Sequence, residues 1–405
     1  MRRTCLLILF LGTAVCFIAA QESTLDDESG GELPAEQPIN ESDSESAADL
    51  DDLFNDPPAD VEAPAEMVDH RSAFEESATV AVNGHFEVTS GFSLGWSAWD
   101  MFADPMASLV FTPGLASAAA VSFDARPDRT LRVYGRVGAS FNPLVGAASW
   151  SSLTIEELYG DYIVGDSLFI RLGKHSLAWG QGRVFAPGNL MADSSTSYNL
   201  RLSLPGIIGS PSLVVLTDQV TDWRQMVYAT KLDFVLADTY LSPAVRYTEI
   251  EGFSGLLSLK RAILQTDISL DLVGRTNAGL WSFTGLGGFF REWDEVILYG
   301  EYQVDWLTSG ILSHKATLAL GLNNPGGVTF DCGLQVVHYF DDNSGIITLG
   351  LTQVILPHLT LNLGIPVIYG AEGSAAVVAN AVSDNPLQAG KRVALMIGLI
   401  LSTDF

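Results

Sequence analysis

Residues 265–275 read QTDISLDLVGR, and apolar and polar side chains alternate along this stretch. Ile268, Leu270 and Leu272 would point to one face of a β-strand, and the polar residues between them would point to the other face. The same period of two recurs from residue 79 onward, most clearly in segments 131–139, 197–204 and 296–306. The sequence therefore predicts an all-β region over residues 78–405, whose strands have two different faces.

The length of these segments and the composition of the chain favour a membrane protein. Many segments span about ten residues, the length that a tilted strand needs to cross the hydrocarbon layer. Hydrophobic residues make up 47% of the chain and charged residues only 17%. A soluble β-sandwich would show the same alternation and is the alternative. Because only helices and closed barrels satisfy the backbone in lipid, and no long apolar run follows residue 20, we expect a transmembrane antiparallel β-barrel.

Turn signals give the number and direction of the strands. They include Gly165-Asp166, Ala237-Asp238 and residues 323–327 and 341–345. With the C-terminus in the periplasm, the two tight turns fall on the periplasmic side, and the loops over residues 180–195 and 370–390 fall outside. Short inner turns and long outer loops are typical of outer-membrane barrels, and the count is about 18 strands, with 16 as the alternative. The count depends most on residues 91–115.

Several tryptophans could anchor such a barrel at the membrane surface. Aromatic side chains near strand ends would suit the two interfacial girdles of a membrane barrel. The candidates are Trp150, Trp179, Trp223, Trp281 and Trp306.

The first 20 residues are typical of a secretory signal peptide. Arg2-Arg3 precedes an apolar stretch over residues 6–20, which ends in small residues. A membrane anchor and lipid attachment at Cys16 are the alternatives. After removal of the signal peptide, Cys332 would be the one cysteine left of three, so no intramolecular disulfide is expected.

An acidic arm follows the signal peptide over residues 21–77. Between Glu22 and Ala78 the chain has 19 acidic residues and one basic residue, Arg71, so this stretch carries −18 of the net charge of −27. It has too few apolar side chains to offset the chain entropy of folding, which predicts a disordered periplasmic arm. The arm could be a solvated leader, or it could dock on a cationic periplasmic partner. Nothing in this charge distribution suggests a nucleic-acid partner.

The end of the chain carries the most specific pattern. Residues 393–405 read VALMIGLILSTDF, with an apolar residue at every second position from Val393 to Leu401 and a final Phe405. This segment resembles the terminal strand of outer-membrane barrel proteins, which typically ends in Phe. The resemblance implies that the barrel assembly machinery recognises Phe405 as its signal, in a bacterial outer membrane.

A second resemblance covers residues 171–189, RLGKHSLAWGQGRVFAPGN. A Gly-basic pair, a Trp-Gly-x-Gly motif starting at Trp179 and a loop with Pro187 resemble a strand-then-loop element of porin-like families. Such families often have Asp where this chain has Asn189. The resemblance to porin-like outer-membrane β-barrels implies passive or substrate-selective uptake of small hydrophilic solutes, with outer-membrane lipid around the barrel.

The polar strand face would line the channel, since a barrel of 16 to 18 strands leaves an aqueous lumen. The pore-lining candidates are Arg132, Arg136, Arg171, Arg201, Lys231, Arg246, Arg275, Asp267, Asp271, Glu301 and Asp305. Rings of such charges set ion preference. We hypothesise a transverse field across the pore, with Arg132, Arg136, Arg171 and Arg201 facing Asp267, Asp271, Glu301 and Asp305. A scatter of structural ion pairs is the alternative.

The loop over residues 182–195 could also shape the pore. Its Pro187-Gly188 turn and small residues permit it to fold inward as a constriction. The sequence does not demand this, and we expect an ordinary surface loop.

No catalytic or metal-binding arrangement is indicated, so neither an enzyme nor a cofactor is expected. His175 and Ser176 are adjacent, which would put their side chains on opposite faces of a strand. No Cys/His cluster has metal-ligand spacing, and no phosphate-binding loop is present. Besides a channel for small solutes, a plugged barrel that transports hydrophobic substrates and a surface adhesin or structural barrel stay open, as does a homo-oligomer.

Overall fold

The computed structural model describes residues 79–405 except 100–103, 143–148, 151–152, 166, 196, 207–208, 218–221, 278–279, 307–311, 326–329, 384 and 386. The predicted signal peptide (1–20) and acidic arm (21–77) lie outside the described residues.

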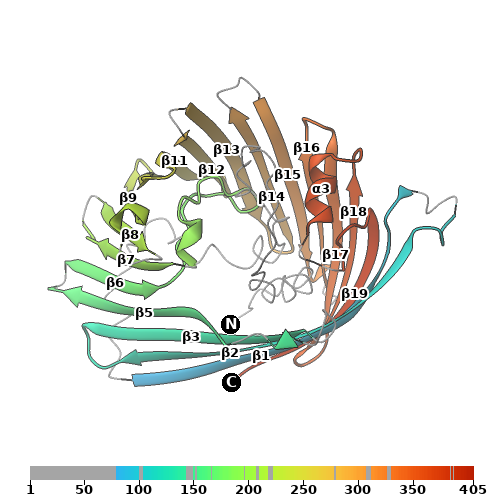
Figure 1. The fold of residues 1–405 in the computed structure, drawn as a ribbon, viewed down its shortest axis with the longest axis horizontal. Coiled ribbons are helices and arrows are strands. Elements are labelled where there is room, and N and C mark those ends of the chain that lie inside the picture. The colour runs from blue at the N-terminus through green and yellow to red at the C-terminus, as the bar shows by residue number, and fades with distance from the viewer. Residues whose placement is uncertain are drawn as a thin grey trace, which may run out of the picture.

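The described chain forms one sheet of nineteen antiparallel strands (Figure 1). The first ten are β1 (Thr79–Trp96), β2 (Leu109–Arg126), β3 (Leu131–Asn142), β4 (Ser149–Trp150), β5 (Thr154–Val164), β6 (Leu168–Lys174), β7 (Tyr198–Ser203), β8 (Ser210–Thr217), β9 (Val227–Leu236) and β10 (Thr239–Thr248). The others are β11 (Gly252–Ile263), β12 (Thr266–Asn277), β13 (Leu280–Glu292), β14 (Val296–Trp306), β15 (Leu312–Asn323), β16 (Phe330–Tyr339), β17 (Ser344–Leu356), β18 (Leu359–Tyr369) and β19 (Val393–Asp404).

Eighteen of these strands run round a closed barrel. The two-residue β4 pairs with β3 beyond the end of β5, and β3 and β5 pair directly with each other. Each strand otherwise pairs with its neighbours in the sequence, and β1 pairs with both β2 and β19. The prediction of about 18 strands is confirmed, and both the 16-strand count and the two-sheet sandwich are wrong. The ambiguous segment 91–115 is the end of β1, a hairpin tip and the start of β2.

A seam between the first and last strands closes the barrel. The register runs from His85 opposite Asp404 to Trp96 opposite Val393. The backbone of Phe405 continues the ladder, since its N–H donates to the Gly84 carbonyl at 2.9 Å and its carbonyl accepts from the Gly84 N–H at 2.7 Å. Before Gly84, β1 pairs with β2 alone among the described strands, so the first residues of β1 project past the end of β19.

The two rims of the barrel differ, as the sequence predicts. The rim with both ends of the described chain has tight connections, including two-residue turns at 237–238 and 264–265. Ala237 and Asp238 have φ values of 48° and 60°, a left-handed pair that suits the twist of a hairpin. The opposite rim carries the longest connections, residues 175–197 between β6 and β7 and residues 370–392 between β18 and β19.

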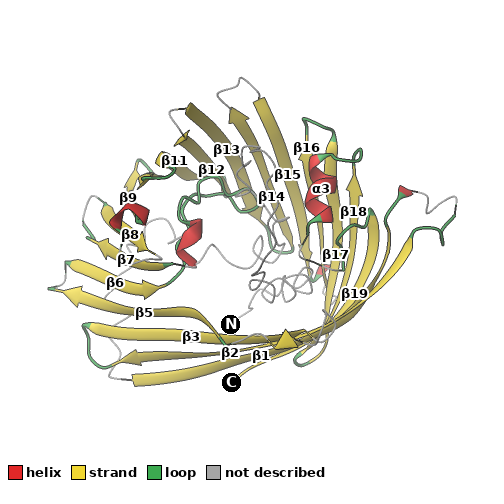
Figure 2. Cartoon of the chain, in the orientation of Figure 1, coloured by secondary structure: helices red, strands yellow, loops and turns green. Residues whose placement is uncertain are grey.

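The strand faces follow the alternation of the sequence. In β12, Ile268 and Leu272 are 44% and 45% exposed on the outer face, whereas Asp271 on the inner face is 1% exposed. Helical structure is confined to connections (Figure 2), with α3 (Ala375–Ala381), η3 (Ala192–Ser195) and η4 (Trp223–Gln225) described. No helix in the described part of the chain combines the length and the apolarity needed to span a membrane.

The tryptophan prediction is right in part. Trp223, Trp281 and Trp306 are all more than half exposed near the rim with the long loops, as a girdle requires. Trp179 is buried inside the barrel, so its assignment to a girdle is wrong. The side chain of Trp150 lies outside the described residues.

Candidate functional site: the barrel lumen

The connection between β6 and β7, residues 175–197, folds into the barrel and does not lie on its surface (Figure 1). We call it the β6–β7 loop. The Gln181 N–H donates to Oδ2 of Asp271 at 2.7 Å, and Asp271 lies on the inner face of β12. The expectation of an ordinary surface loop is therefore wrong. The physical reason is that inward carboxylates on distant strands accept hydrogen bonds from the backbone of the loop.

Glu301 on β14 is the main anchor of this loop. Its Oε1 accepts from the Arg183 N–H at 2.6 Å, and its Oε2 accepts from the N–H groups of Val184 and Phe185 at 3.2 and 2.8 Å. The hydroxyl of Tyr299 also accepts from the Arg183 N–H, at 3.3 Å. Four hydrogen bonds, three of them to the carboxyl group of Glu301, thus fix the tip of the loop.

Apolar packing holds the rest of the β6–β7 loop against the inner wall. Leu177, Trp179, Leu190 and Met191 of the loop form one buried cluster with inward side chains of β8 to β12. The wall residues are Val214, Leu216, Ala229, Ala244, Leu256 and Val273. Phe185 at the tip packs against Leu286 and Val337 on the far side of the loop. The loop is thus wedged across one part of the lumen.

Cations complete the attachment of this loop. The guanidinium of Arg275, one of the predicted pore residues, donates to the Pro187 carbonyl at 3.1 Å. Arg183 lies over the ring of Phe290, with its guanidinium carbon 4.0 Å from the ring centroid. Lys315 lies over the ring of Phe185, with its ammonium nitrogen 4.7 Å from the centroid. Sequence reasoning missed Arg183, Phe185 and Tyr299, because their roles depend on where the loop lies.

A cationic wall lies on the strands that precede this loop. Arg132 on β3 forms ion pairs with Asp124 at 3.0 Å and with Asp161 at 3.6 Å. Asp161 is buried on β5 and also pairs with Arg171 on β6, at 2.7 Å. Arg171 is directly opposite Arg201 on β7 in the strand register. The network places guanidinium groups on β3, β6 and β7 side by side along the inner wall.

The other predicted charges mostly have partners on their own or adjacent strands. Lys231 pairs with Asp233 at 3.3 Å, Arg136 with Glu156 at 2.6 Å, and Arg246 with Glu251. Asp267 pairs with Lys260 at 3.1 Å. Asp305 accepts from the Thr284 hydroxyl at 2.6 Å and from the Gln303 amide at 2.9 Å.

These contacts bear on the predicted field across the pore. The arginines lie on β3, β6 and β7, and the four carboxylates lie on β12 and β14, so the strand order does separate the two groups. Asp271 and Glu301, however, bind the backbone of the β6–β7 loop, which lies between the two groups. The described geometry combines local ion pairs in the cationic wall with carboxylates that position a loop.

The connection between β18 and β19, residues 370–392, also packs against the inner side of the barrel. We call it the β18–β19 loop. Ala376 of α3 packs against Ile346 and Ile368, and Leu387 packs against Ala116 and Met396. No local pattern in the sequence predicts this arrangement.

A buried lysine ties this loop to the first hairpin. The ammonium of Lys391 donates to the hydroxyls of Ser93 and Thr112 at 2.7 and 2.8 Å and to the Leu387 carbonyl at 2.6 Å. The next residue, Arg392, pairs with Glu372 at 2.7 Å. Contacts of this kind join residues that are far apart in the sequence.

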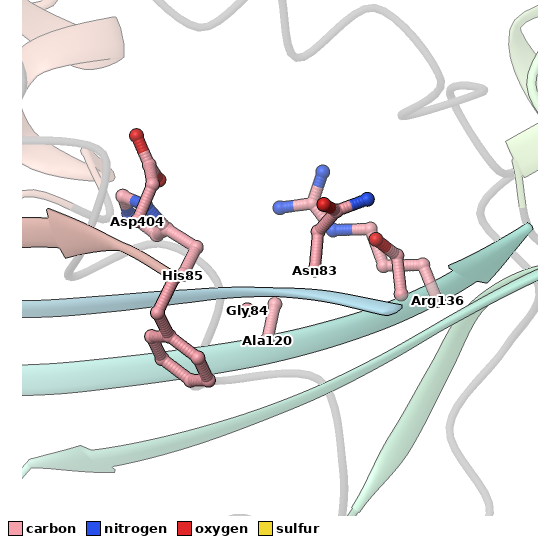
Figure 3. A pocket seen from close by; sticks show the side chains of 8 residues that line it. Asn83, Gly84, His85, Ala120, Arg136 and Asp404 are labelled. Atoms are coloured by element: carbon pink, nitrogen blue, oxygen red, sulfur yellow. The ribbon is translucent and has the colours of Figure 1, made fainter. Parts of the chain in front are cut away.

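A pocket lies at the seam, near the ends of the described chain (Figure 3). His85 and Asp404 lie together there, with Nδ1 and Oδ1 2.7 Å apart, and Asn83 lies near Arg136. A Cβ atom on Gly84 would stand 2.1 Å from the ring of Phe405. Glycine at this position therefore leaves room for the terminal ring on the outside of the barrel.

No group of three or more metal-ligating side chains occurs among the described residues.

Solved structures resemble this barrel at low sequence identity. Pseudomonas aeruginosa OpdQ matches with a TM-score of 0.53 at 8% identity, covering 80% of this chain and 97% of that chain. Pseudomonas aeruginosa OprD matches with a TM-score of 0.51 at 8% identity, covering 81% and 97%. Acinetobacter baumannii OccAB4 gives 0.51 at 8% identity, covering 81% and 99%. No protein-family model and no curated protein matches the chain. At these identities the likeness shows a shared fold.

Proposed function

We propose that this chain, whose fold is that of porin-like outer-membrane β-barrels, forms a channel for passive or substrate-selective uptake of small hydrophilic solutes. One observation carries the proposal: the closed 18-strand barrel has an apolar outer face and an inner face with charged side chains from many strands. Lipid requires the first face, and an aqueous pathway uses the second. The solved porin structures of the same fold support this proposal.

The cationic wall on β3, β6 and β7 sets the ion preference of the proposed channel. Arg132, Arg171 and Arg201 lie along one stretch of the inner wall, within reach of ions that pass the β6–β7 loop. Rings and rows of like charge raise the local concentration of counter-ions. We keep as pore-lining residues the charged side chains that the strand alternation places on the inner face. Of these, Asp271, Glu301 and Arg275 act on solutes through the β6–β7 loop, which they hold in position.

A conductance measurement tests the proposal. The mature chain from Gln21 on would be purified in detergent and inserted in a planar lipid bilayer. We expect discrete, stable current steps. A β-rich, heat-modifiable protein that never conducts would overturn the open channel, and the plugged hydrophobic transporter or the adhesin would then be the better function.

Export, assembly and oligomeric state belong to the same proposal. Residues 1–20 direct secretion, and Phe405 is the residue that the barrel assembly machinery recognises. The exposed ring of Phe405 beside Gly84 supports this role, because it leaves the side chain accessible at the end of the last strand. Chemical cross-linking in intact membranes would report whether the channel is a homo-oligomer. The chain acts by conducting solutes and not by catalysis.

A further inference from the structure

A row of aromatic side chains crosses the outer face of the barrel from β14 to β18, near the rim with the long loops; these strands are neighbours in the sheet (Figure 1). The rings, which we call the aromatic row, are those of Tyr302, His314, Phe340, His338 and Tyr369. Neighbouring ring centroids lie between 4.6 and 6.1 Å apart. Tyr302 and Phe340 are 43% and 41% exposed, whereas Glu301 and Gln303, which flank Tyr302, are buried on the inner face. The aromatic row therefore faces the surroundings of the barrel and not its lumen.

Two hydrogen bonds between histidine and tyrosine fix the rings of this row. Nδ1 of His314 lies 2.8 Å from the Tyr302 hydroxyl, and Nδ1 of His338 lies 2.8 Å from the Tyr369 hydroxyl. Gly345 makes room for the second pair, since a Cβ atom there would stand 2.3 Å from the hydroxyl oxygen of Tyr369. Because both bonds use Nδ1, the second nitrogen of each imidazole, Nε2, is left for another partner.

A carboxylate is held beside the aromatic row in a fixed position. Oδ2 of Asp341 accepts from the Ser313 hydroxyl at 2.5 Å and from the His314 N–H at 3.3 Å. Oδ1 of Asp341 lies 3.9 Å from Nε2 of His314, and the Asp341 side chain is 41% exposed. Asp341 also follows Phe340 directly in the sequence. An exposed ring and a carboxylate oxygen that can accept further hydrogen bonds thus lie together at this rim.

The charges of these strands argue against a phosphate ligand. Lys315 is the only lysine or arginine in residues 296–369. Its ammonium points into the barrel, 4.7 Å from the centroid of the Phe185 ring. A phosphate group on the aromatic row would therefore meet the carboxylate of Asp341 and no lysine or arginine of its strands. An uncharged ligand that is rich in hydroxyl groups fits this surface better.

The sugar headgroup of a membrane lipid has the chemistry that this surface would recognise. One face of a sugar ring is a patch of C–H groups that packs against aromatic rings, and its hydroxyl groups both donate and accept hydrogen bonds. Further from the rim, the same outer face carries Leu318, Leu334 and Leu349, which are 51%, 39% and 48% exposed. An acyl chain can lie along these leucines while its headgroup lies on the aromatic row. The two surfaces together select a glycolipid over a free sugar.

We propose that the aromatic row and Asp341 bind the sugar headgroup of a glycolipid in the membrane leaflet on the side of the long loops. The rings of Tyr302 and Phe340 pack against the sugar ring, and Asp341 and the two imidazoles bond to its hydroxyl groups. The imidazoles and the carboxylate distinguish this site from a general aromatic girdle. The binding requires that the barrel spans a membrane and does not depend on whether the barrel conducts.

Native mass spectrometry would measure which lipid the protein retains. The mature chain from Gln21 on would be reconstituted in phosphatidylethanolamine vesicles that also hold equal amounts of a monoglucosyl diacylglycerol and phosphatidylglycerol. It would then be extracted in an amine-oxide detergent, because the sugar of a maltoside detergent would compete for the site. We expect the retained glucolipid to exceed the retained phosphatidylglycerol several-fold. Equal retention, more phosphatidylglycerol, or displacement of the glucolipid by an equal concentration of free glucose would overturn the proposal.

Single substitutions would locate the retained glucolipid. We expect Phe340→Leu and Asp341→Asn to lower its retention several-fold and Phe340→Trp to keep it, because the larger ring still offers an aromatic face. Phe253→Leu is the matched control, since the Phe253 ring is 55% exposed near the same rim and pairs with Tyr247 at 4.7 Å. Full retention in both Phe340→Leu and Asp341→Asn would overturn the site. An equal loss in Phe253→Leu would do so too, because any ring of the girdle would then serve.

Discussion

At the residue scale, the parity of the strands predicted which charged side chains point inward but not what they bind. Asp271 and Glu301 were expected to act on ions, and the structure uses both to hold the backbone of the β6–β7 loop. Alternation is a local property, so a sequence reveals the face of Glu301. Its partners Arg183 and Phe185 are more than a hundred residues away, and no local pattern encodes that contact.

Replacing the main anchor should release this loop. In Glu301→Gln, the amide keeps the shape of the side chain but replaces one acceptor oxygen with an NH₂ donor that would face a backbone N–H group. We expect loop docking to weaken by about 1–3 kcal/mol, because at least one buried N–H group would lose its acceptor. Limited proteolysis of the folded protein should then cut within residues 175–197. Glu249→Gln, in an exposed turn, is the control, and an unchanged cleavage pattern in Glu301→Gln would contradict the assignment.

The cationic wall can be tested with a single charge. Arg201→Gln removes one guanidinium from the row on β3, β6 and β7, at the position opposite Arg171 in the strand register. We expect the reversal potential in a salt gradient to shift toward cation preference while the barrel stays folded. Arg224→Gln, on the exposed side of η4, should leave the reversal potential unchanged. Equal potentials for all three proteins would show that the wall does not set ion preference.

At the scale of elements, the strands were predictable and the long connections were not. In β12 and in β14, apolar and polar residues alternate over about a dozen residues. This alternation is enough to identify each segment as a strand. The β18–β19 loop instead depends on contacts such as Lys391 with Ser93, 298 positions apart. Small side chains in α3 permit its packing against Ile346 and Ile368, but they would equally permit an exposed loop.

The docking of α3 should depend on acid pH through Asp342. This carboxylate accepts from the N–H groups of Ala375 and Ser344 at 2.6 and 3.0 Å. Burial alone would raise the pKa of Asp342, but the hydrogen bonds from Ser344 and Ala375 outweigh burial and lower the pKa below its ordinary value. The stabilisation is therefore present above the unfolded pKa of about 4 and is lost as the pH falls through the lower folded pKa.

Hydrogen exchange of residues 370–392 would measure this dependence. We expect constant protection from pH 7 to 5 and a loss below about pH 4. Asp342→Asn should lower protection at neutral pH and remove the acid transition. A transition that persists unchanged in Asp342→Asn would assign it to another group.

At the scale of the whole molecule, strand number and direction were predictable because the barrel is a meander of neighbouring hairpins. The alternation of apolar and polar residues does not indicate how far one strand is shifted against the next. That offset puts Gly84 beside Phe405 and leaves the start of β1 projecting past the last strand. The alternating strands and their turn signals thus predicted a closed barrel, whereas the summed register determines where its ends meet.

Removal of the last residue tests the assembly signal. Deleting Phe405 takes away two backbone hydrogen bonds to Gly84 and the exposed ring beside it. We expect the outer-membrane level in cells to fall several-fold, while the deleted protein still refolds in detergent, since the other pairings of the seam persist. Phe405→Tyr is the conservative control. Normal levels without Phe405 would mean that the signal lies elsewhere.

The seam makes the starting point of this chain arbitrary as far as pairing is concerned. Both ends of the described chain lie on the rim with tight turns, and β1 and β19 are hydrogen-bonded like any other neighbouring pair. A circular permutant would have a linker across the old ends and new ends at 237–238. It would keep every strand pair and lose only the covalent connection between β9 and β10 at that turn. Such a chain would form the same barrel in detergent while ending in β9 instead of Phe405. The order in which the strands are synthesised could thus be changed while their order round the barrel stays the same.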